Sequence, residues 1–213
     1  MSEPVNDPVT DRRAARVAET ERRILAAAAE LFVRDGYQAT TLTAVAEAAG
    51  VAHRTVYVRF GTKVALLRRT VDVAVAGDTE DRSVAEREWA QEALSAPTLA
   101  ERIDALVDGT VALMGRAADL FEVALQAQSG EPELVEAFTA GRAATRQMLH
   151  GFVDAACRDG LAVPADDPDW QRESVALSGQ AETHLLLRRM TGWSPEQYGD
   201  WLRRTLTALL PAR

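Results

Sequence analysis

The polar residues best placed for chemistry lie on one short predicted helix, residues 53–60. Val56 and Phe60 recur there at i and i+4 and face inward. A second short predicted helix, residues 42–49, comes before it, and Gly50 makes a tight turn between the two. Two short helices joined in this way are the helix-turn-helix pattern, which places its second helix in the major groove of DNA. The polar residues available on the outer face for contacts with DNA are His53, Arg54, Thr55 and Arg59.

The charge of the chain is unevenly distributed. The formal net charge is −8, yet residues 10–70 hold 11 Arg and Lys against 6 Asp and Glu, whereas residues 71–213 hold 13 against 24. A basic segment joined to an acidic body favours nucleic acid as the partner of the basic segment. Chance clustering of charge on solvated helix faces is the competing explanation, and charge alone does not separate the two.

Sequence patterns of common enzymes are absent. The chain has no Gly-x-Gly, no His-Glu-x-x-His and no Gly-x-Ser-x-Gly, and Gly61-Thr62-Lys63 lacks the earlier glycine of a phosphate loop. The one cysteine, Cys157, excludes an internal disulfide and a cysteine-based metal cluster. We therefore expect no enzyme activity, no cofactor and no metal site. An enzyme whose catalytic groups are scattered along the sequence is the alternative.

Helix signals cover most of the chain. Alanine occurs 39 times, and capping boxes begin at Ser83, Thr98 and Ser194. The sequence predicts an all-α protein in which an N-terminal helix-turn-helix domain precedes a larger C-terminal helical bundle. The helices are expected near residues 20–35, 42–49, 53–60, 63–77, 84–94, 99–114, 117–129, 132–158, 168–190 and 195–210.

Many residues between positions 36 and 66 match one known pattern at fixed spacing. The pattern begins with an aromatic residue after glycine and then a threonine pair. It continues with an apolar-Ala pair, Ala-Gly-Val, an apolar-Tyr pair, Phe and Lys. The matching positions are Gly36, Tyr37, Thr41, Leu42, Val45, Ala46, Ala49, Gly50, Val51, Thr55, Val56, Tyr57, Phe60, Lys63 and Leu66. With them, about a quarter of the chain resembles the TetR family of bacterial transcriptional regulators.

The resemblance implies a DNA-binding role for each matching polar position. Thr41 and Thr43 would contact phosphate at the start of the second helix, as would Lys63, for which a solvated charge is the alternative. Tyr57 would reach the DNA backbone through its hydroxyl while its ring packs on the domain. Base edges would be contacted by His53, Arg54 and Thr55. The sequence departs from the family pattern at two positions near the predicted helix 53–60. Ala52 stands where the family commonly has a serine that caps the helix, and Arg54 stands where it often has a small residue or proline.

After about residue 70 the resemblance weakens, in the part that binds diverse small molecules in this family. Large apolar residues are spread over the predicted helices there, and ordinary core packing is the competing explanation for each of them. An apolar pocket with a few polar groups is the default site for such a ligand. The candidate ligand-binding residues are Trp89, Met114, Phe121, Leu125, Phe138, Met148, Phe152 and His184, with Gln126 and Gln128 as further polar members.

The last helix carries a broad apolar stripe. The family forms its dimer through its last two long helices, and recognition of palindromic DNA requires a twofold axis. The stripe is therefore expected to lie in a homodimer interface, with a core within one chain as the alternative. The expected interface residues are Leu177, Ala181, Leu185, Tyr198, Trp201, Leu202, Thr205, Leu206 and Leu209.

These observations predict a ligand-responsive, homodimeric regulator that binds a palindromic DNA operator and a small-molecule effector. Its expected domains are a flexible arm at 1–18, a helix-turn-helix DNA-binding domain at 19–66, and a ligand-binding and dimerisation domain at 67–213. An all-α enzyme or small-molecule carrier that does not bind DNA is one alternative, and a DNA-binding architectural protein without an effector site is another. No membrane association is expected, because the longest run without a polar residue is six residues. The start shows no secretory signal, so the expected location is the cytoplasm.

Overall fold

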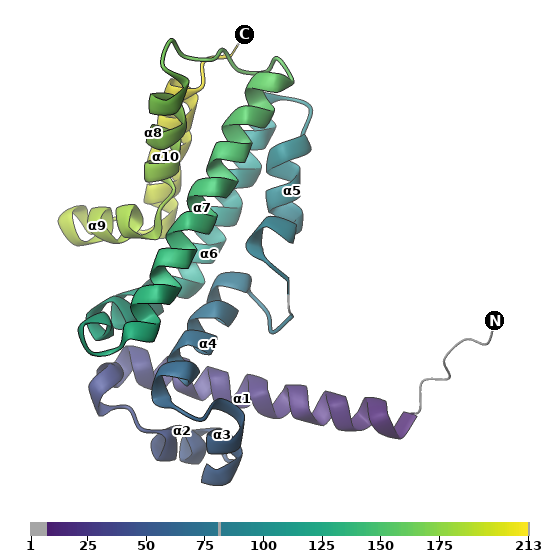
Figure 1. The fold of residues 1–213 in the computed structure, drawn as a ribbon, viewed down its shortest axis with the longest axis vertical. Coiled ribbons are helices and arrows are strands. Elements are labelled where there is room, and N and C mark those ends of the chain that lie inside the picture. The colour runs from purple at the N-terminus through teal and green to yellow at the C-terminus, as the bar shows by residue number, and fades with distance from the viewer. Residues whose placement is uncertain (1–7, 81, 213) are drawn as a thin grey trace.

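A computed structural model describes residues 8–80 and 82–212, with side chains from Ala15 onward. These residues form ten α-helices and two short 3-10 helices, and their only strand-like pairing is one isolated bridge, so the predicted all-α fold is confirmed (Figure 1). The α-helices are α1 (Pro8–Ala39), α2 (Leu42–Ala49), α3 (His53–Phe60), α4 (Lys63–Ala76), α5 (Glu88–Ser95), α6 (Leu99–Ala127), α7 (Pro132–Arg158), α8 (Pro168–Ser178), α9 (Ala181–Thr191) and α10 (Pro195–Leu209).

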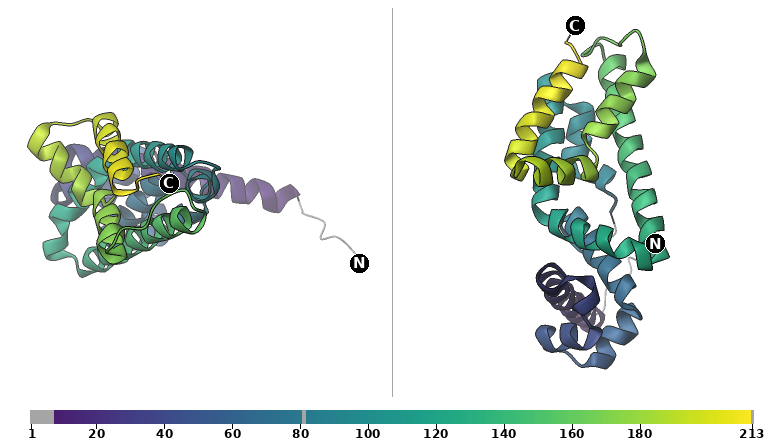
Figure 2. Two further views of the ribbon diagram at one scale, coloured as in Figure 1. Left: turned by 90° about the horizontal axis from the view of Figure 1, so that it is seen from above. Right: turned by 90° about the vertical axis from the view of Figure 1, so that its left-hand side faces the viewer.

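The molecule is elongated, with α1 to α4 at one end and the C-terminus at the other (Figures 1 and 2). We call α1 to α4 the N-terminal unit and α5 to α10 the body. The long helices α6 and α7 run along the body, and α9 projects sideways from the end of α8 and α10. None of the helices in the described ranges combines the length and the apolar character needed to cross a bilayer.

Two hydrophobic cores hold the fold together. One core joins α1 to α4, and the C-terminal end of α6 completes it with Leu120, Val123 and Ala124. The other core lies in the body, between α5, α6, α7, α8 and α10. Because α6 contributes to both cores, the N-terminal unit and the body are packed as one structure. The predicted domain boundary between residues 66 and 67 falls inside α4, and the division into domains stays a prediction.

Local sequence signals explain where most helices begin. Thr98 and Glu101 form the expected capping box of α6, and Ser194 with Gln197 forms that of α10. The box at Ser83 is also present, but it starts a 3-10 turn at Val84–Glu86, and α5 begins only at Glu88. These side chains satisfy N–H groups that have no partner within the helix.

Other helix bounds also differ from the expectation. The predicted helices 99–114 and 117–129 are one helix, α6, because Gly115 sits in open space and does not break it. The predicted helix 168–190 is two, since the chain bends at Gly179, where an added Cβ would lie 2.7 Å from Leu149 Cδ1. Residues 8–18 of the predicted flexible arm are helical in α1, and residues 1–7 lie outside the described residues.

A glycine in α6 allows a tryptophan to pack closely. A Cβ added at Gly109 would lie 2.2 Å from Cδ2 of Trp89, so Gly109→Ala must displace the indole ring. Such overpacking costs about 1–3 kcal/mol. Gly115→Ala is the matched control in the same helix, because nothing lies within 4 Å of its added Cβ. Alanine there should stabilise the fold by roughly 0.5–1 kcal/mol.

Urea unfolding of both variants measures this difference. We expect the midpoint of Gly109→Ala to fall below wild type and that of Gly115→Ala to rise above it. Equal midpoints for the two variants would contradict the close packing of Trp89 on α6.

Candidate functional site

The helix pair α2 and α3 is fixed by capping and by α1. Thr41 caps α2 and accepts a hydrogen bond from the Ala44 N–H at 3.1 Å. At the other end Gly50 takes a left-handed conformation (φ 63°, ψ 41°), which favours glycine. Arg23 of α1 donates to the carbonyls of Ala49 and Gly50. The turn between α2 and α3 is therefore held against α1.

Helix α3 buries one side and exposes the other. Val56 is fully buried in the N-terminal core, whereas His53 and Arg54 are exposed. Tyr57 is 59% exposed, so much of its side chain faces solvent. Val58, which sequence reasoning missed, is 71% exposed. The only sequence signal for it is its place one turn after Arg54, on the face opposite Val56. Of the other expected residues, Thr43 is exposed and Thr55 is half-buried.

Arg59 is engaged inside the N-terminal unit. Its guanidinium forms an ion pair with Glu21 of α1, and Glu21 also accepts a hydrogen bond from Arg69 at 3.1 Å. Partial burial by itself would raise the pKa of Glu21, but the hydrogen bonds from Arg59 and Arg69 outweigh it and lower that pKa. The charge of Arg59 is thus balanced by a carboxylate of the same chain.

Lys63 is engaged in a similar way at the start of α4. Its Nζ donates to the carbonyl oxygens of Tyr37 at 2.7 Å and Gln38 at 3.2 Å, and it lies 4.3 Å from the centre of the Tyr37 ring. The Tyr37 hydroxyl donates to Glu131 Oε1 at 2.5 Å, across to the start of α7. Burial and this carboxylate raise the pKa of Tyr37. Two of the three Lys63 N–H groups are therefore used within the protein.

A cavity of about 410 Å³ lies between α4 of the N-terminal unit and the body. Its walls come from α4, α5, α6, α7, the segment 82–85 and the junction of α8 and α9. The volume lies within the range of small-molecule sites. Five of the expected ligand-binding residues line it: Trp89, Met114, Phe121, Phe138 and Met148.

Three expected ligand-binding residues do not line the cavity. Phe152 and His184 are each 1% exposed and belong to the packed interior, and Leu125 points elsewhere from α6. His184 packs edge-on against Tyr198 at 4.8 Å between ring centres. Neither ring nitrogen of His184 has a hydrogen-bond partner among the described residues. Gln126 and Gln128 are also absent from the cavity wall.

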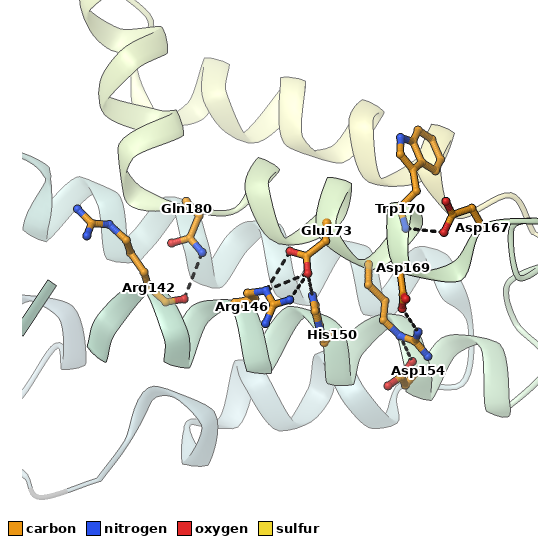
Figure 3. Close-up of polar contacts among 10 residues, drawn as sticks. Arg142, Arg146, His150, Asp154, Asp167, Asp169, Trp170, Glu173 and Gln180 are labelled. Carbon is orange, nitrogen blue, oxygen red and sulfur yellow. Dashed lines mark hydrogen bonds and ion pairs between the residues drawn. The ribbon is translucent and has the colours of Figure 1, made fainter. Parts of the chain in front are cut away.

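Ion pairs join α7, which lines the cavity, to α8 (Figure 3). Arg146 pairs with Glu173, and Arg172 with Asp154 at 2.7 Å. At the bend after α8, the Gln180 side chain donates to the Arg142 carbonyl at 3.3 Å. The bend therefore fixes Gln180 and its neighbours in the cavity wall.

The expected dimer residues of α10 are mostly core. Tyr198, Leu202 and Leu206 are at most 2% exposed, as is Leu185 of α9, so they have no surface to offer a second chain. Their expected role in direct contacts between subunits is therefore wrong. The physical reason is that α6 of the same chain covers the stripe, where an added Cβ at Gly199 would lie 2.5 Å from Val111 Cγ2.

The remaining expected dimer residues keep some surface. Ala181, Trp201, Thr205 and Leu209 are partly exposed, and Leu177 is 64% exposed. Three further apolar side chains of α8 and α9 are exposed and were not anticipated. They are Trp170 at 57%, Leu186 at 54% and Met190 at 73%. Their exposure could not be read from the sequence, because it depends on how α8 and α9 pack against the rest of the body.

The chain is thus an all-α protein in which a helix-turn-helix unit precedes a helical body with a cavity. Residues 24–70 match the sequence model of the bacterial regulatory proteins of the tetR family. Residues 24–70 therefore carry a TetR-family N-terminal domain, which confirms the resemblance seen in the sequence.

Solved structures of similar fold cover nearly the whole chain. SmeT in its triclosan complex has a TM-score of 0.69 at 17% identity, covering 90% of this chain and 91% of its own. A protein of Saccharomonospora viridis assigned as a transcriptional regulator, in complex with choline, has a TM-score of 0.68 at 16% identity, covering 92% and 98%. NalD of Pseudomonas aeruginosa, a secondary repressor of the MexAB-OprM multidrug efflux pump, has a TM-score of 0.61 at 23% identity, covering 90% and 95%. No curated protein matches the chain in sequence.

The buried His184 makes stability depend on pH. Burial lowers its pKa below 6.5, nearby Arg188 lowers it further, and Glu122 opposes this only in part. The unfolded chain therefore binds a proton more readily than the folded one. Folding stability should fall as pH drops below about 6.5, towards the lowered pKa of the folded state.

Unfolding in urea at pH 7.5 and pH 5.5 tests this dependence. His184→Phe keeps the aromatic contact with Tyr198 and removes the titrating group, so its loss of stability over this interval should be smaller than that of wild type. His53→Gln is the control, because His53 is exposed on α3. The assignment fails if His184→Phe and wild type lose the same stability.

Proposed function

We propose that the chain is a homodimeric transcriptional repressor that binds a palindromic DNA operator and is released from it by a small-molecule effector. This proposal rests on the structure of α3. One side of the helix is buried in the N-terminal core, and the opposite side exposes the side chains that could contact DNA. The TetR-family domain at residues 24–70 supports the same assignment. The cavity in the body gives the effector a site that adjoins α4.

The DNA contacts are proposed from side-chain chemistry and exposure. His53, Arg54 and Thr55 contact base edges from the first turn of α3, and arginine suits guanine in particular. Thr41, Thr43 and Tyr57 contact phosphates. We add Val58, whose exposed methyl groups suit the thymine methyl.

Arg59 and Lys63 take modified roles in this proposal. Both cations have partners within the N-terminal unit, Arg59 on Glu21 and Lys63 on the end of α1. Lys63 contacts phosphate through its remaining N–H, and Arg59 holds α3 against α1.

The dimer is proposed to form through exposed apolar residues of α8 and α9. Two half-sites of a palindrome, about 34–36 Å apart, call for two copies of the chain related by a twofold axis. Soluble monomers rarely leave several large apolar side chains exposed together. Those of α8 and α9 are Trp170, Leu177, Leu186 and Met190.

The effector is proposed to act through α4. This helix begins beside the DNA-facing helices and continues into the cavity wall, which includes Val71 and Val75. A ligand that binds more tightly to the conformation unable to bind DNA lowers the affinity for the operator. The loss of binding free energy cannot exceed the difference between the ligand's binding free energies for the two conformations. The choline and triclosan complexes of similar folds support a small molecule as the effector class.

Selection of bound fragments from random-sequence DNA tests the DNA-binding proposal. On the selected sequence, Arg54→Ala should lose about 1–3 kcal/mol of binding free energy and relax the preference at one base position of each half-site. Arg34→Ala is the control, because Arg34 is exposed on α1 and pairs with the adjacent Asp35. Base contact by Arg54 is excluded if Arg54→Ala weakens scrambled DNA equally, and failure to enrich any sequence favours a ligand-binding protein without an operator.

Sedimentation tests the dimer. Leu177→Glu with Leu186→Glu should convert a dimer into a folded monomer, because each carboxylate would otherwise be buried without a partner at the interface. Leu202→Glu should instead unfold the chain, since Leu202 is 2% exposed within the single chain. A wild-type monomer at micromolar concentration would overturn this part of the proposal.

A further inference from the structure

Glu21 of α1 joins three helices of the N-terminal unit. Its Oε2 pairs with Arg59 at the C-terminal end of α3, and its Oε1 pairs with Arg69 of α4 at 3.1 Å. Only 15% of the Glu21 side chain is exposed, so little water competes for these contacts. The carboxylate therefore ties the end of α3 to both α1 and α4.

Arg69 also reaches the connection between α4 and α5. Its Nε pairs with Glu21, and its Nη2 donates to the carbonyl oxygen of Thr79 at 3.1 Å. Thr79 lies two residues after Gly77, the C-terminal cap of α4. A single guanidinium group thus bridges Glu21 and the first residues of the connection.

Arg87 holds the same connection from its other end, immediately before α5. It is 7% exposed and forms an ion pair with Asp78. Its Nη2 donates to Asp78 Oδ1 at 3.0 Å and to the carbonyl oxygen of Arg82 at 3.3 Å. A buried guanidinium group is costly to leave without its carboxylate. The two ends of the connection are therefore held together around Arg87.

Part of this connection forms the cavity wall. Residues 82–85 line the cavity, as does Trp89 of α5. A continuous series of polar contacts, which we call the polar path, runs from this wall to α3. It passes from the Arg82 carbonyl to Arg87 and Asp78, and from the adjoining Thr79 to Arg69, Glu21 and Arg59. Contiguous contacts of this kind can carry energetic coupling between two sites.

We propose that Glu21 is a positioning residue through which the cavity wall at residues 82–85 controls the position of α3. This inference rests on the proposed regulatory function and names the contacts that transmit it. A ligand that displaces the wall moves the Thr79 carbonyl, and Arg69 then loses one of its two partners. Because Arg59 shares Glu21 with Arg69, a shift of Arg69 changes the contact that holds the end of α3.

The polar path can be broken without damage to the hydrophobic cores. Glu21, Arg69 and Asp78 belong to neither core, so conservative substitutions there remove a contact and leave the apolar packing of α4 intact. Coupling is also reciprocal, so the wall must respond to α3 as much as α3 responds to the wall. Both directions can therefore be measured.

Hydrogen exchange of the full chain, followed by mass spectrometry without DNA or ligand, tests the link. Glu21→Gln removes the charge that holds both arginines but keeps the size of the side chain. Backbone amides of α3 and of residues 82–87 should both exchange about two- to fivefold faster, as expected for the loss of partly exposed ion pairs. Glu19→Gln is the matched control on α1, because Glu19 is 54% exposed and pairs with Arg22. It should change neither region.

Asp78→Asn breaks the polar path from the cavity side, and it should also speed the exchange of α3. Among the described residues, the polar contacts of Asp78 are with Arg87 and the Glu80 N–H, so any effect on α3 must be transmitted. In the Glu21→Gln background the same substitution should leave α3 unchanged, because the path is already broken. Glu80→Gln is the control in the same connection, since Glu80 pairs with Arg82 and both side chains are more than half exposed. It should leave α3 at the wild-type rate.

Operator DNA tests the reverse direction. A saturating amount of the selected sequence should slow the exchange of residues 82–87 in wild type, because DNA fixes α3 and the polar path extends that order to the wall. The same DNA should not slow these residues in Glu21→Gln.

Three results would overturn the proposal. Glu21→Gln could speed exchange in α3 alone, which would show that Glu21 only braces α3 locally. Asp78→Asn could leave α3 unchanged, a result that also decides the matter if Glu21→Gln does not fold. Operator DNA could slow α3 and leave residues 82–87 at their free rate. Failure of the DNA selection would instead remove the regulatory function, while exchange without DNA would still show whether the polar path couples the two regions.

Discussion

The position of α2 and α3 relative to the body depends on the contacts of Tyr37. At Gly36 (φ 80°) the chain leaves helical geometry, which glycine tolerates best, and the next residue turns into the N-terminal core. The Tyr37 hydroxyl bonds to Glu131 at the start of α7, and Lys63 at the start of α4 lies over its ring. One side chain thus joins the end of α1, the start of α4 and the start of α7. A shift of α7 along the cavity must move or break these contacts.

Helix α4 is held at both ends and lines the cavity between them. Its first half, with Val64, Leu66 and Leu67, is buried in the N-terminal core. Near its C-terminal end, Arg116 of α6 donates to the carbonyl of Ala74 at 3.1 Å. A ligand beside this helix therefore meets a segment that cannot move without disturbing either the N-terminal core or the contact with α6. This constraint gives the proposed effector a physical route to α3.

The features that could be predicted from the sequence are those that depend on nearby residues. The bounds of α2, α3 and α7 agree with the expectation because caps, glycine turns and apolar spacing are local. The bend at Gly179 brings that residue against Leu149 of another helix, a contact that the sequence does not show. The apolar stripe of α10 correctly predicted a buried face, but a periodic pattern cannot say whether α6 of the same chain or a second chain covers that face. For the same reason, the sequence could not distinguish the five residues that line the cavity from Phe152 and His184, which are buried in the interior.

The basic charge of residues 10–70 overstates the charge free to meet DNA. Arg23 and Lys63 are bound to backbone carbonyls, and Arg59 and Arg69 share Glu21. Exposed ion pairs with neighbouring carboxylates cost little to break. The ion pairs of Arg59 and Arg69 with Glu21 also hold α3 and α4 against α1. These four cations are therefore less available for phosphate, and counterion release from them contributes less to the proposed DNA affinity than the sequence charge implies. In the proposed operator complex, recognition therefore rests more heavily on the α3 face around Arg54.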